Sequence, residues 1–80
     1  MSRVYITPKA QKQFKHFPLS EQAKIKKKFT ILKDDPSIGK KLSGELSELR
    51  SLRVWPYRII YYTEKDCVFV VSIIHRQGAY

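Results

Sequence analysis

The sequence predicts an α+β domain in which two helices cover one face of a small, largely antiparallel sheet. The first half has apolar residues at helical spacing, the second half has three apolar segments of strand length, and short turn-forming connections join those segments. All 80 residues fit a single domain, residues 1–80. Because a chain of this size buries about 60% of its unfolded surface, we do not expect a deep active site.

The N-terminal part predicts a short strand followed by a helix. Residues 3–7 alternate polar and apolar side chains, as a half-buried strand does. Thr7 can cap a helix whose first residue is Pro8. Apolar side chains at Ala10, Phe14 and Phe17 then fall on one helical face, and we expect this helix to end at Pro18.

A second helix is predicted from Ser20 to the Asp34-Asp35-Pro36 stop. Its apolar residues follow helical spacing and are predicted to face the core: Ala23, Ile25, Phe29 and Leu32. The two helices form a hairpin, and residues 37–43 are predicted to be a loop.

Three strands are predicted in the second half, at residues 46–54, 57–63 and 67–74. Trp55-Pro56 and residues 64–66 are short enough to be hairpin connections, so these strands should form an antiparallel meander. Helices on one face of this sheet would leave its other face available for binding.

The basic residues are sorted by type along the chain. There are 16 Lys and Arg against 7 Asp and Glu, a formal net charge of +9, which favours a polyanionic partner such as nucleic acid, although basic domains also bind acidic proteins. Most lysines precede residue 42, whereas most arginines follow it. Arginine makes bidentate bonds to phosphate and lysine acts as a hydrated point charge, so two roles are expected.

Strand parity predicts where the arginines point, because successive side chains of a strand face opposite ways. The helix-covered face is expected to hold a set of apolar residues: Leu52, Val54, Ile59, Tyr61, Phe69, Val71 and Ile73. In that arrangement Arg53, Arg58 and Arg76 emerge together on the uncovered face, with Ile60 and Ile74 beside them. Three converging guanidinium groups match a phosphate.

The remaining reactive side chains have structural interpretations. His75 falls in the core-facing set at the end of its strand, and His16 lies where it can interact with a helix C-terminus. Cys67 is expected to be a core thiol in a reducing compartment. Two distant histidines and one cysteine give no metal-ligand spacing, so we expect neither a metal nor another cofactor. The apolar runs are too short to span a membrane and no signal peptide is evident, which predicts a cytoplasmic protein.

Two segments, LSGELSELRSLRVWPYRIIYY and VFVVSIIHRQGAY, resemble the RelE/ParE family of toxins from toxin-antitoxin pairs. The likeness extends over nearly the whole chain and includes the Pro8 helix start and the lysine-rich hairpin. It implies the RelE-like fold, with an N-terminal strand, a helical hairpin and an antiparallel meander.

The resemblance also implies two alternative activities. RelE-like members enter the ribosome and cut messenger RNA with the RNA's own 2'-hydroxyl group as nucleophile, whereas ParE-like members inhibit DNA gyrase without cutting. We expect the first activity here, with the ribosome, mRNA and a cognate antitoxin protein as partners. Residues matching the nuclease branch are the expected catalytic set: Arg53, Arg58, Arg76 and Tyr80.

Further roles follow from the resemblance. Arg58 would stabilise charge on the phosphorane-like transition state, Arg76 the leaving oxygen, and Tyr80 a stacked base. Arg53 would hold the RNA backbone or help activate the 2'-hydroxyl group, and the expected RNA-binding residues are Lys40, Lys41 and Arg50. The sequence departs from the nuclease pattern at Leu49 and Ser51, where lysines are usual. The candidates for the proton acceptor therefore stay open: Lys40, Lys41, Glu45 and Glu48.

Overall fold

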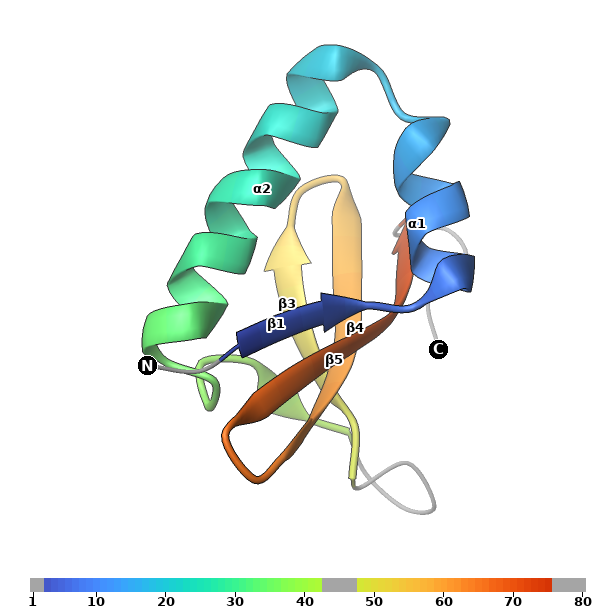
Figure 1. The fold of residues 1–80 in the computed structure, drawn as a ribbon. Coiled ribbons are helices and arrows are strands. Elements are labelled where there is room, and N and C mark those ends of the chain that lie inside the picture. The colour runs from blue at the N-terminus through green and yellow to red at the C-terminus, as the bar shows by residue number, and fades with distance from the viewer. Residues whose placement is uncertain (1–2, 43–47, 76–80) are drawn as a thin grey trace.

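A computed structural model of the chain shows two helices and a five-stranded sheet (Figure 1) and describes residues 3–42 and 48–75. In chain order the elements are β1 (Arg3–Ile6), α1 (Pro8–Lys15), α2 (Leu19–Asp34), β2 (Lys40–Lys41), β3 (Arg50–Val54), β4 (Tyr57–Glu64) and β5 (Cys67–His75). The predicted α+β class with its helical hairpin and antiparallel meander is confirmed. The strand predicted from Leu46 begins only at Arg50, because Glu48 lies in a turn and Leu49 is not in a strand; residues 46–47 lie outside the described residues.

The sheet has the strand order β1-β5-β4-β3-β2. β1 runs parallel to β5, and the other neighbouring pairs are antiparallel. The loop predicted for residues 37–43 is wrong in part, because Lys40 and Lys41 pair with Ser51 and Arg50 as the short strand β2. Two residues cannot show the alternation by which a strand is detected in a sequence.

Helix α1 begins as its sequence predicts. The backbone N–H of Ala10 donates to the Thr7 hydroxyl at 3.3 Å, and Pro8 occupies the first turn, where its missing N–H costs nothing. Ala10 is buried, and Phe14 and Phe17 pack against the core. His16 is the C-cap residue of this helix. The capping rules therefore account for the start of α1, whereas the helix ends at Lys15, before the end that was predicted at Pro18.

Helix α2 buries one stripe of its surface. Ile25, Phe29 and Leu32 are buried at helical spacing, whereas Ala23 is exposed, so the prediction that Ala23 faces the core is wrong. Ala23 precedes Ile25 by two residues, which places it on the other side of a 3.6-residue turn. The lysines of α2 consequently lie away from the core.

The hydrophobic core lies between the helices and one sheet face. It joins Ile25, Phe29 and Leu32 of α2 to side chains of β3 and β4, including Leu52, Ile59 and the fully buried Tyr61. The opposite face carries no helix in the described part of the chain. We call this opposite face the open face.

A bulge in β5 changes which residues meet the core. Ile60 pairs with Ser72 but Tyr61 pairs with Val70, so Val71 is an extra residue in the register. An extra residue in a strand reverses the sheet face to which the side chains of the preceding residues point. Val68 and Val70 are therefore fully buried in the core, and the prediction that Phe69 and Val71 lie in the core-facing set is wrong.

Helix α1 supplies the hydrogen-bond acceptor that β5 needs beyond the end of β1. The Gln13 side-chain oxygen Oε1 accepts from the Ile73 backbone N–H at 2.7 Å and from the Ser72 hydroxyl at 3.3 Å. β1 pairs with β5 only as far as Val70. One helical side chain thus substitutes for the missing ladder partner at the bulge.

Candidate functional site

Two arginines face each other on the open face. Arg53 of β3 is directly opposite Arg58 of β4, and Ile74 of β5 is the next neighbour across the sheet. Directly opposite residues have Cβ atoms about 5 Å apart, and like charges in such pairs repel. Among the described residues the one ion pair is Lys24 with Glu21, so no carboxylate of the described residues neutralises these two guanidinium groups.

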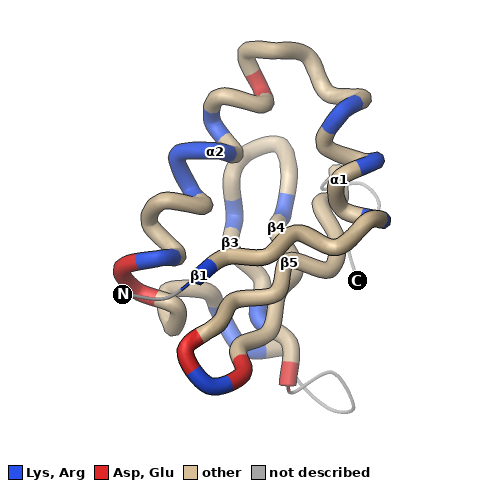
Figure 2. Tube along the Cα trace, in the orientation of Figure 1, with Lys and Arg blue, Asp and Glu red and all other residues tan. Residues whose placement is uncertain are grey.

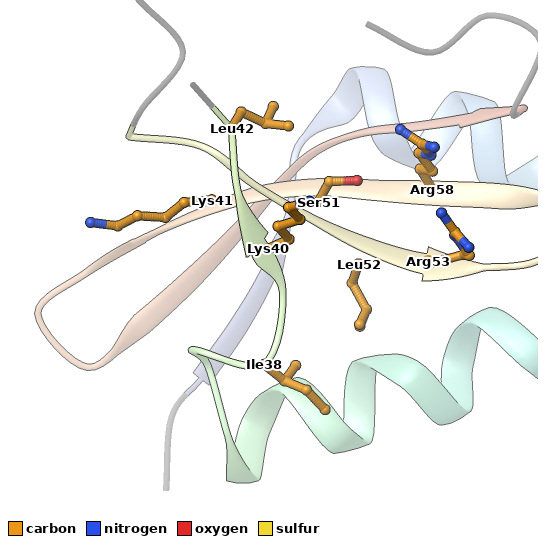
Figure 3. A pocket seen from close by; sticks show the side chains of 8 residues that line it. All are labelled: Ile38, Lys40, Lys41, Leu42, Ser51, Leu52, Arg53 and Arg58. Carbon is orange, nitrogen blue, oxygen red and sulfur yellow. The ribbon is translucent and has the colours of Figure 1, made fainter. Parts of the chain in front are cut away.

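The two arginines border a hollow of about 780 Å³ at the outer side of β3 (Figure 3). Lys40 and Ser51 line it from the open face, and Ile38 and Leu52 line it from the side of α2. Lys41 and Leu42 complete the wall, and no acidic residue is among the lining side chains. The hollow therefore combines four cationic side chains with an apolar floor.

The buried hydroxyl of Tyr61 fixes the segment that leads into β2. It donates to the Pro36 carbonyl at 2.8 Å and accepts from the Gly39 N–H at 2.8 Å. A Cβ atom at Gly39 would lie 2.5 Å from that hydroxyl oxygen, so the close approach requires glycine. Burial raises the pKa of Tyr61, against the opposing effects of the Gly39 hydrogen bond and the Arg50 charge. These two hydrogen bonds of the Tyr61 hydroxyl form a clamp, which fixes the position at which the strand of Lys40 and Lys41 begins.

Arg50 takes part in the same clamp. Its Nη1 donates to the Gly39 carbonyl at 2.8 Å and to the Ser37 carbonyl at 3.3 Å. Its register partner is the core residue Tyr61, so Arg50 lies on the opposite side of the sheet from Arg53. The predicted RNA-binding role of Arg50 stays a prediction, and the observed contacts give it a structural role.

The other predicted site residues divide by position. Lys40 and Lys41 line the hollow with Arg53 and Arg58, and the exposed Glu48 lies in a turn before β3. Arg76, Tyr80 and Glu45 lie outside the described residues. His75 is exposed at the end of β5, where its ring meets the edge of Tyr57 at 5.6 Å between centroids.

A row of aromatic rings crosses the open face away from the arginines. Phe69 stacks between Tyr5 and Tyr62, with ring centroids 5.5 and 5.0 Å away. Sequence reasoning missed this row because the bulge moved Phe69 out of the predicted core set. Only the register, which depends on the bulge, could have indicated it.

Positive charge extends beyond the sheet. Figure 2 shows Lys and Arg along both helices as well as on β3 and β4. Acidic residues lie near the β4–β5 turn, at both ends of α2 and just before β3. A second hollow, lined by side chains of α2 and of the β3–β4 turn, continues from Arg53: Lys24, Lys27, Lys28, Ile31, Val54 and Trp55. In the described part of the chain no three His, Cys, Asp or Glu side chains gather as metal ligands.

The family model for the ParE toxin of type II toxin-antitoxin systems matches residues 4–80. The chain belongs to the ParE toxin family. No curated protein matches the chain.

Solved structures of RelE toxins share this fold. A toxin-antitoxin complex, RelBE2 from Mycobacterium tuberculosis, matches with a TM-score of 0.87 and 25% identity over 94% of this chain and 98% of that one. The isolated RelE toxin of E. coli matches with a TM-score of 0.82 and 22% identity over 94% of this chain and 84% of that one. The archaeal RelE-RelB complex of Pyrococcus horikoshii matches with a TM-score of 0.79 and 22% identity over 98% of both chains. The predicted RelE-like fold is thereby confirmed.

Membership in the ParE toxin family makes the chain a toxin of a type II toxin-antitoxin system. It does not distinguish the two activities named above, because RelE proteins share the same fold. No helix in the described parts of the chain is long and apolar enough to cross a membrane. The choice of activity therefore depends on the chemistry that the open face can support.

Proposed function

We propose that this toxin is a ribosome-dependent endoribonuclease that cuts mRNA. The observation that supports the proposal is the pair of Arg53 and Arg58, which has no ion-pair partner among the described residues. The pair is held on rigid strands beside Lys40 and faces an open hollow. Two guanidinium groups with fixed spacing suit a phosphodiester, which carries two nonbridging oxygens. A surface that had only to keep the protein soluble would gain nothing from opposing two like charges.

The reaction consists of an internal displacement at phosphorus. The 2'-oxygen forms a bond to the adjacent phosphorus, the bond to the 5'-oxygen breaks, and the products are a 2',3'-cyclic phosphate and a 5'-hydroxyl end. Negative charge grows on the nonbridging oxygens in the transition state, where Arg58 and Arg53 stabilise it more than in the bound substrate. The 2'-hydroxyl proton leaves to a base, and a proton reaches the departing 5'-oxygen.

The resemblance assigns the remaining roles. Lys40, Lys41 and Glu48 are the candidate bases among the described residues, and Lys40 is the one that lies on the open face beside Arg53. Arg76 would act on the leaving oxygen and Tyr80 would stack on a base. Because the hollow is open and positively charged, it suits a substrate presented by the ribosome better than a free small molecule.

We further propose that a cognate antitoxin covers this face in the cytoplasm. Several solved relatives are complexes with antitoxins, among them RelE-RelB of Pyrococcus horikoshii. An antitoxin that neutralises by occlusion would bring acidic groups to Arg53 and Arg58.

The proposal is tested by translating a reporter message in a cell-free system with the purified toxin and mapping the new 3' ends on the message. We expect cuts within the translated region that disappear when ribosomes are left out. Arg58→Ala should reduce cleavage by about a hundredfold or more, the scale on which one stabilising donor acts in a transition state. Lys12→Ala, at an exposed position of α1 that lines neither hollow, is the control and should leave cleavage unchanged.

A DNA gyrase inhibitor is the second candidate, favoured by the match to the ParE family model. In that case the same translation reaction would leave the message intact, and the toxin would block supercoiling by gyrase. That pair of results would overturn the endoribonuclease proposal.

A further inference from the structure

The row of stacked rings on the open face has an end at which a further ring can be added. Phe69 lies between Tyr5 and Tyr62, with interplanar angles of 18° and 17°, so the three rings stand nearly parallel across β1, β5 and β4. Because Phe69 is on the β5 side of Tyr62, the other ring face of Tyr62 is turned toward the β3 side of the sheet. Among the described residues no fourth ring stacks there.

A third hollow, of about 650 Å³, lies at this end of the row and has Tyr62 in its wall. The other lining side chains come from β2, from β3 and the turn before it, and from the end of β4: Lys41, Glu48, Arg50, Thr63 and Glu64. Its volume falls in the range of sites for small organic groups, about 300–1,000 Å³. We call this hollow the Tyr62 pocket.

The lining charges of the Tyr62 pocket are balanced. Lys41 and Arg50 carry positive charge and Glu48 and Glu64 carry negative charge, whereas no acidic residue lines the hollow beside Arg53. A cationic hollow suits a phosphate, but a balanced one suits a neutral group that has both hydrogen-bond donors and acceptors. A nucleobase is such a group, because its planar ring can stack and its edge carries both donors and acceptors.

The polar groups of the Tyr62 pocket are disposed to bind a base edge. Hydrogen bonds from Nη1 to the carbonyls of Ser37 and Gly39 hold Arg50 in place, and a guanidinium group has five N–H donors in all. In the described part of the chain neither Glu48 nor Glu64 forms an ion pair. A carboxylate accepts well from the amino group of a base, such as N4 of cytosine.

We propose that the Tyr62 pocket binds one nucleobase of a single-stranded RNA, which stacks on Tyr62 and extends the row of rings. This inference rests on the proposed function in taking the message as that RNA. Tyr62 follows Arg58 by four residues on the same face of β4, about 13 Å along the strand. One RNA strand can therefore place a phosphate at Arg58 and a nearby base at Tyr62, and the pocket sets the position of the message relative to the bond that is cut.

The row of rings also has a purely structural interpretation, because cross-strand aromatic pairs stabilise a sheet without any ligand. That role treats the two ends of the row alike. Base binding distinguishes them, since the balanced polar pocket adjoins Tyr62 whereas Tyr5 lies at the opposite end, on the edge strand β1. The experiments below therefore compare the two ends.

The first experiment measures how tightly the purified full chain binds a short, fluorescently labelled oligocytidylate, by anisotropy. Its riboses carry 2'-O-methyl groups, so that no 2'-oxygen can attack phosphorus. The comparison probe has the same backbone and charge but no bases. We expect the oligocytidylate to bind at least about tenfold more tightly, because its base stacks on an aromatic ring. Equal affinities would show that backbone charge alone is bound, and would overturn the inference.

Matched substitutions locate the site. Tyr62→Leu should weaken the oligocytidylate about fivefold or more and leave the probe without bases unaffected, and Tyr62→Phe, which keeps the ring, should bind as the wild type does. Tyr5→Leu makes the same change at the other end of the row and should keep wild-type affinity. Thermal unfolding shows whether each variant is folded. Equal weakening by the two Leu variants would mean that the row only supports the sheet, and the inference would fail.

The carboxylates of the Tyr62 pocket predict a choice between pyrimidines. Cytosine has an amino group where uracil has a carbonyl oxygen, and carboxylates attract the first and repel the second. We expect the wild type to prefer oligocytidylate over oligouridylate by about fivefold or more. The double variant Glu48→Gln, Glu64→Gln should lose most of this preference. Both probes carry the same charge, so the ratio does not depend on net charge. A ratio near one in the wild type, or one that the double variant leaves unchanged, would overturn the assignment.

A competition experiment distinguishes RNA from a free nucleotide as the occupant. Cytidine monophosphate should displace the labelled oligocytidylate only at concentrations at least about tenfold above those of unlabelled oligocytidylate, because it lacks the phosphates that reach Arg58. Equal potency would assign the Tyr62 pocket to a free nucleotide and overturn the proposal. These assays contain no ribosomes, so their failure is distinguishable from failure of the proposed cleavage, which is measured in translating extracts.

Discussion

At the scale of single residues, function and stability make opposite demands on the Arg53–Arg58 pair. Two guanidinium groups opposite each other on neighbouring strands repel, at a cost of about 0.2–1 kcal/mol. Such a pair is retained at a cost to folding, which is typical of a binding site that an anion completes.

Arg53→Gln should therefore stabilise the free protein at low salt. Removing one charge abolishes the repulsion, and we expect a gain of up to about 1 kcal/mol in the free energy of unfolding. Chemical denaturation measures it, and a double-mutant cycle with Arg58→Gln isolates the coupling between the two sites. Lys12→Gln controls for the lower net charge. A coupling energy of zero would show that the two guanidinium groups do not repel each other measurably.

Tyr61→Phe should destabilise the fold and change how its stability depends on pH. The variant leaves the Gly39 N–H and the Pro36 carbonyl without their partner, which costs about 1–3 kcal/mol. The pKa of Tyr61 is raised in the folded protein, so its contribution is complete below the unfolded pKa near 10 and is lost as pH rises through the folded pKa.

Urea denaturation at neutral and at alkaline pH checks both effects. The wild type should lose more stability than Tyr61→Phe as the pH rises past about 10. Parallel pH profiles for the two proteins would contradict this account of the clamp.

At the scale of the elements, the bulge in β5 and helix α1 depend on each other. Gln13→Ala should destabilise the protein by about 1–3 kcal/mol, because the buried Ile73 N–H loses its acceptor. Gln13→Glu keeps an acceptor at the same place and should retain most of the stability. Thermal unfolding of the two variants decides the point, and equal losses would indicate that α1 contributes by packing alone.

The helices, the meander and the placement of Arg53 and Arg58 could be predicted because each follows from local pattern. Thr7-Pro8 starts α1, and strand parity holds through β3 and β4, which contain no irregularity. Phe69 was misplaced because a bulge obeys no local rule, and β2 is too short to have a pattern. The two hollows beside β3 could not be predicted, since they depend on where β2 ends relative to β3.

At the scale of the whole molecule, the formal charge of +9 governs association with polyanions. If the toxin acts on mRNA as proposed, its binding to RNA should weaken steeply as salt rises, because its lysines and arginines release the counterions condensed on the RNA. Measuring affinity for an oligouridylate between low and physiological salt gives the slope. Arg58→Gln should make that slope shallower by about one unit if Arg58 contacts a phosphate.

The outer edge of β3, which β2 pairs only in part, also bears on whether this protein associates with itself. A free strand edge is where identical chains join into aggregates, and charged side chains beside an edge are a common protection against that. The lysines and arginines that line the two hollows beside β3 repel a second copy of this basic chain. We expect this charge to oppose self-association through the edge of β3.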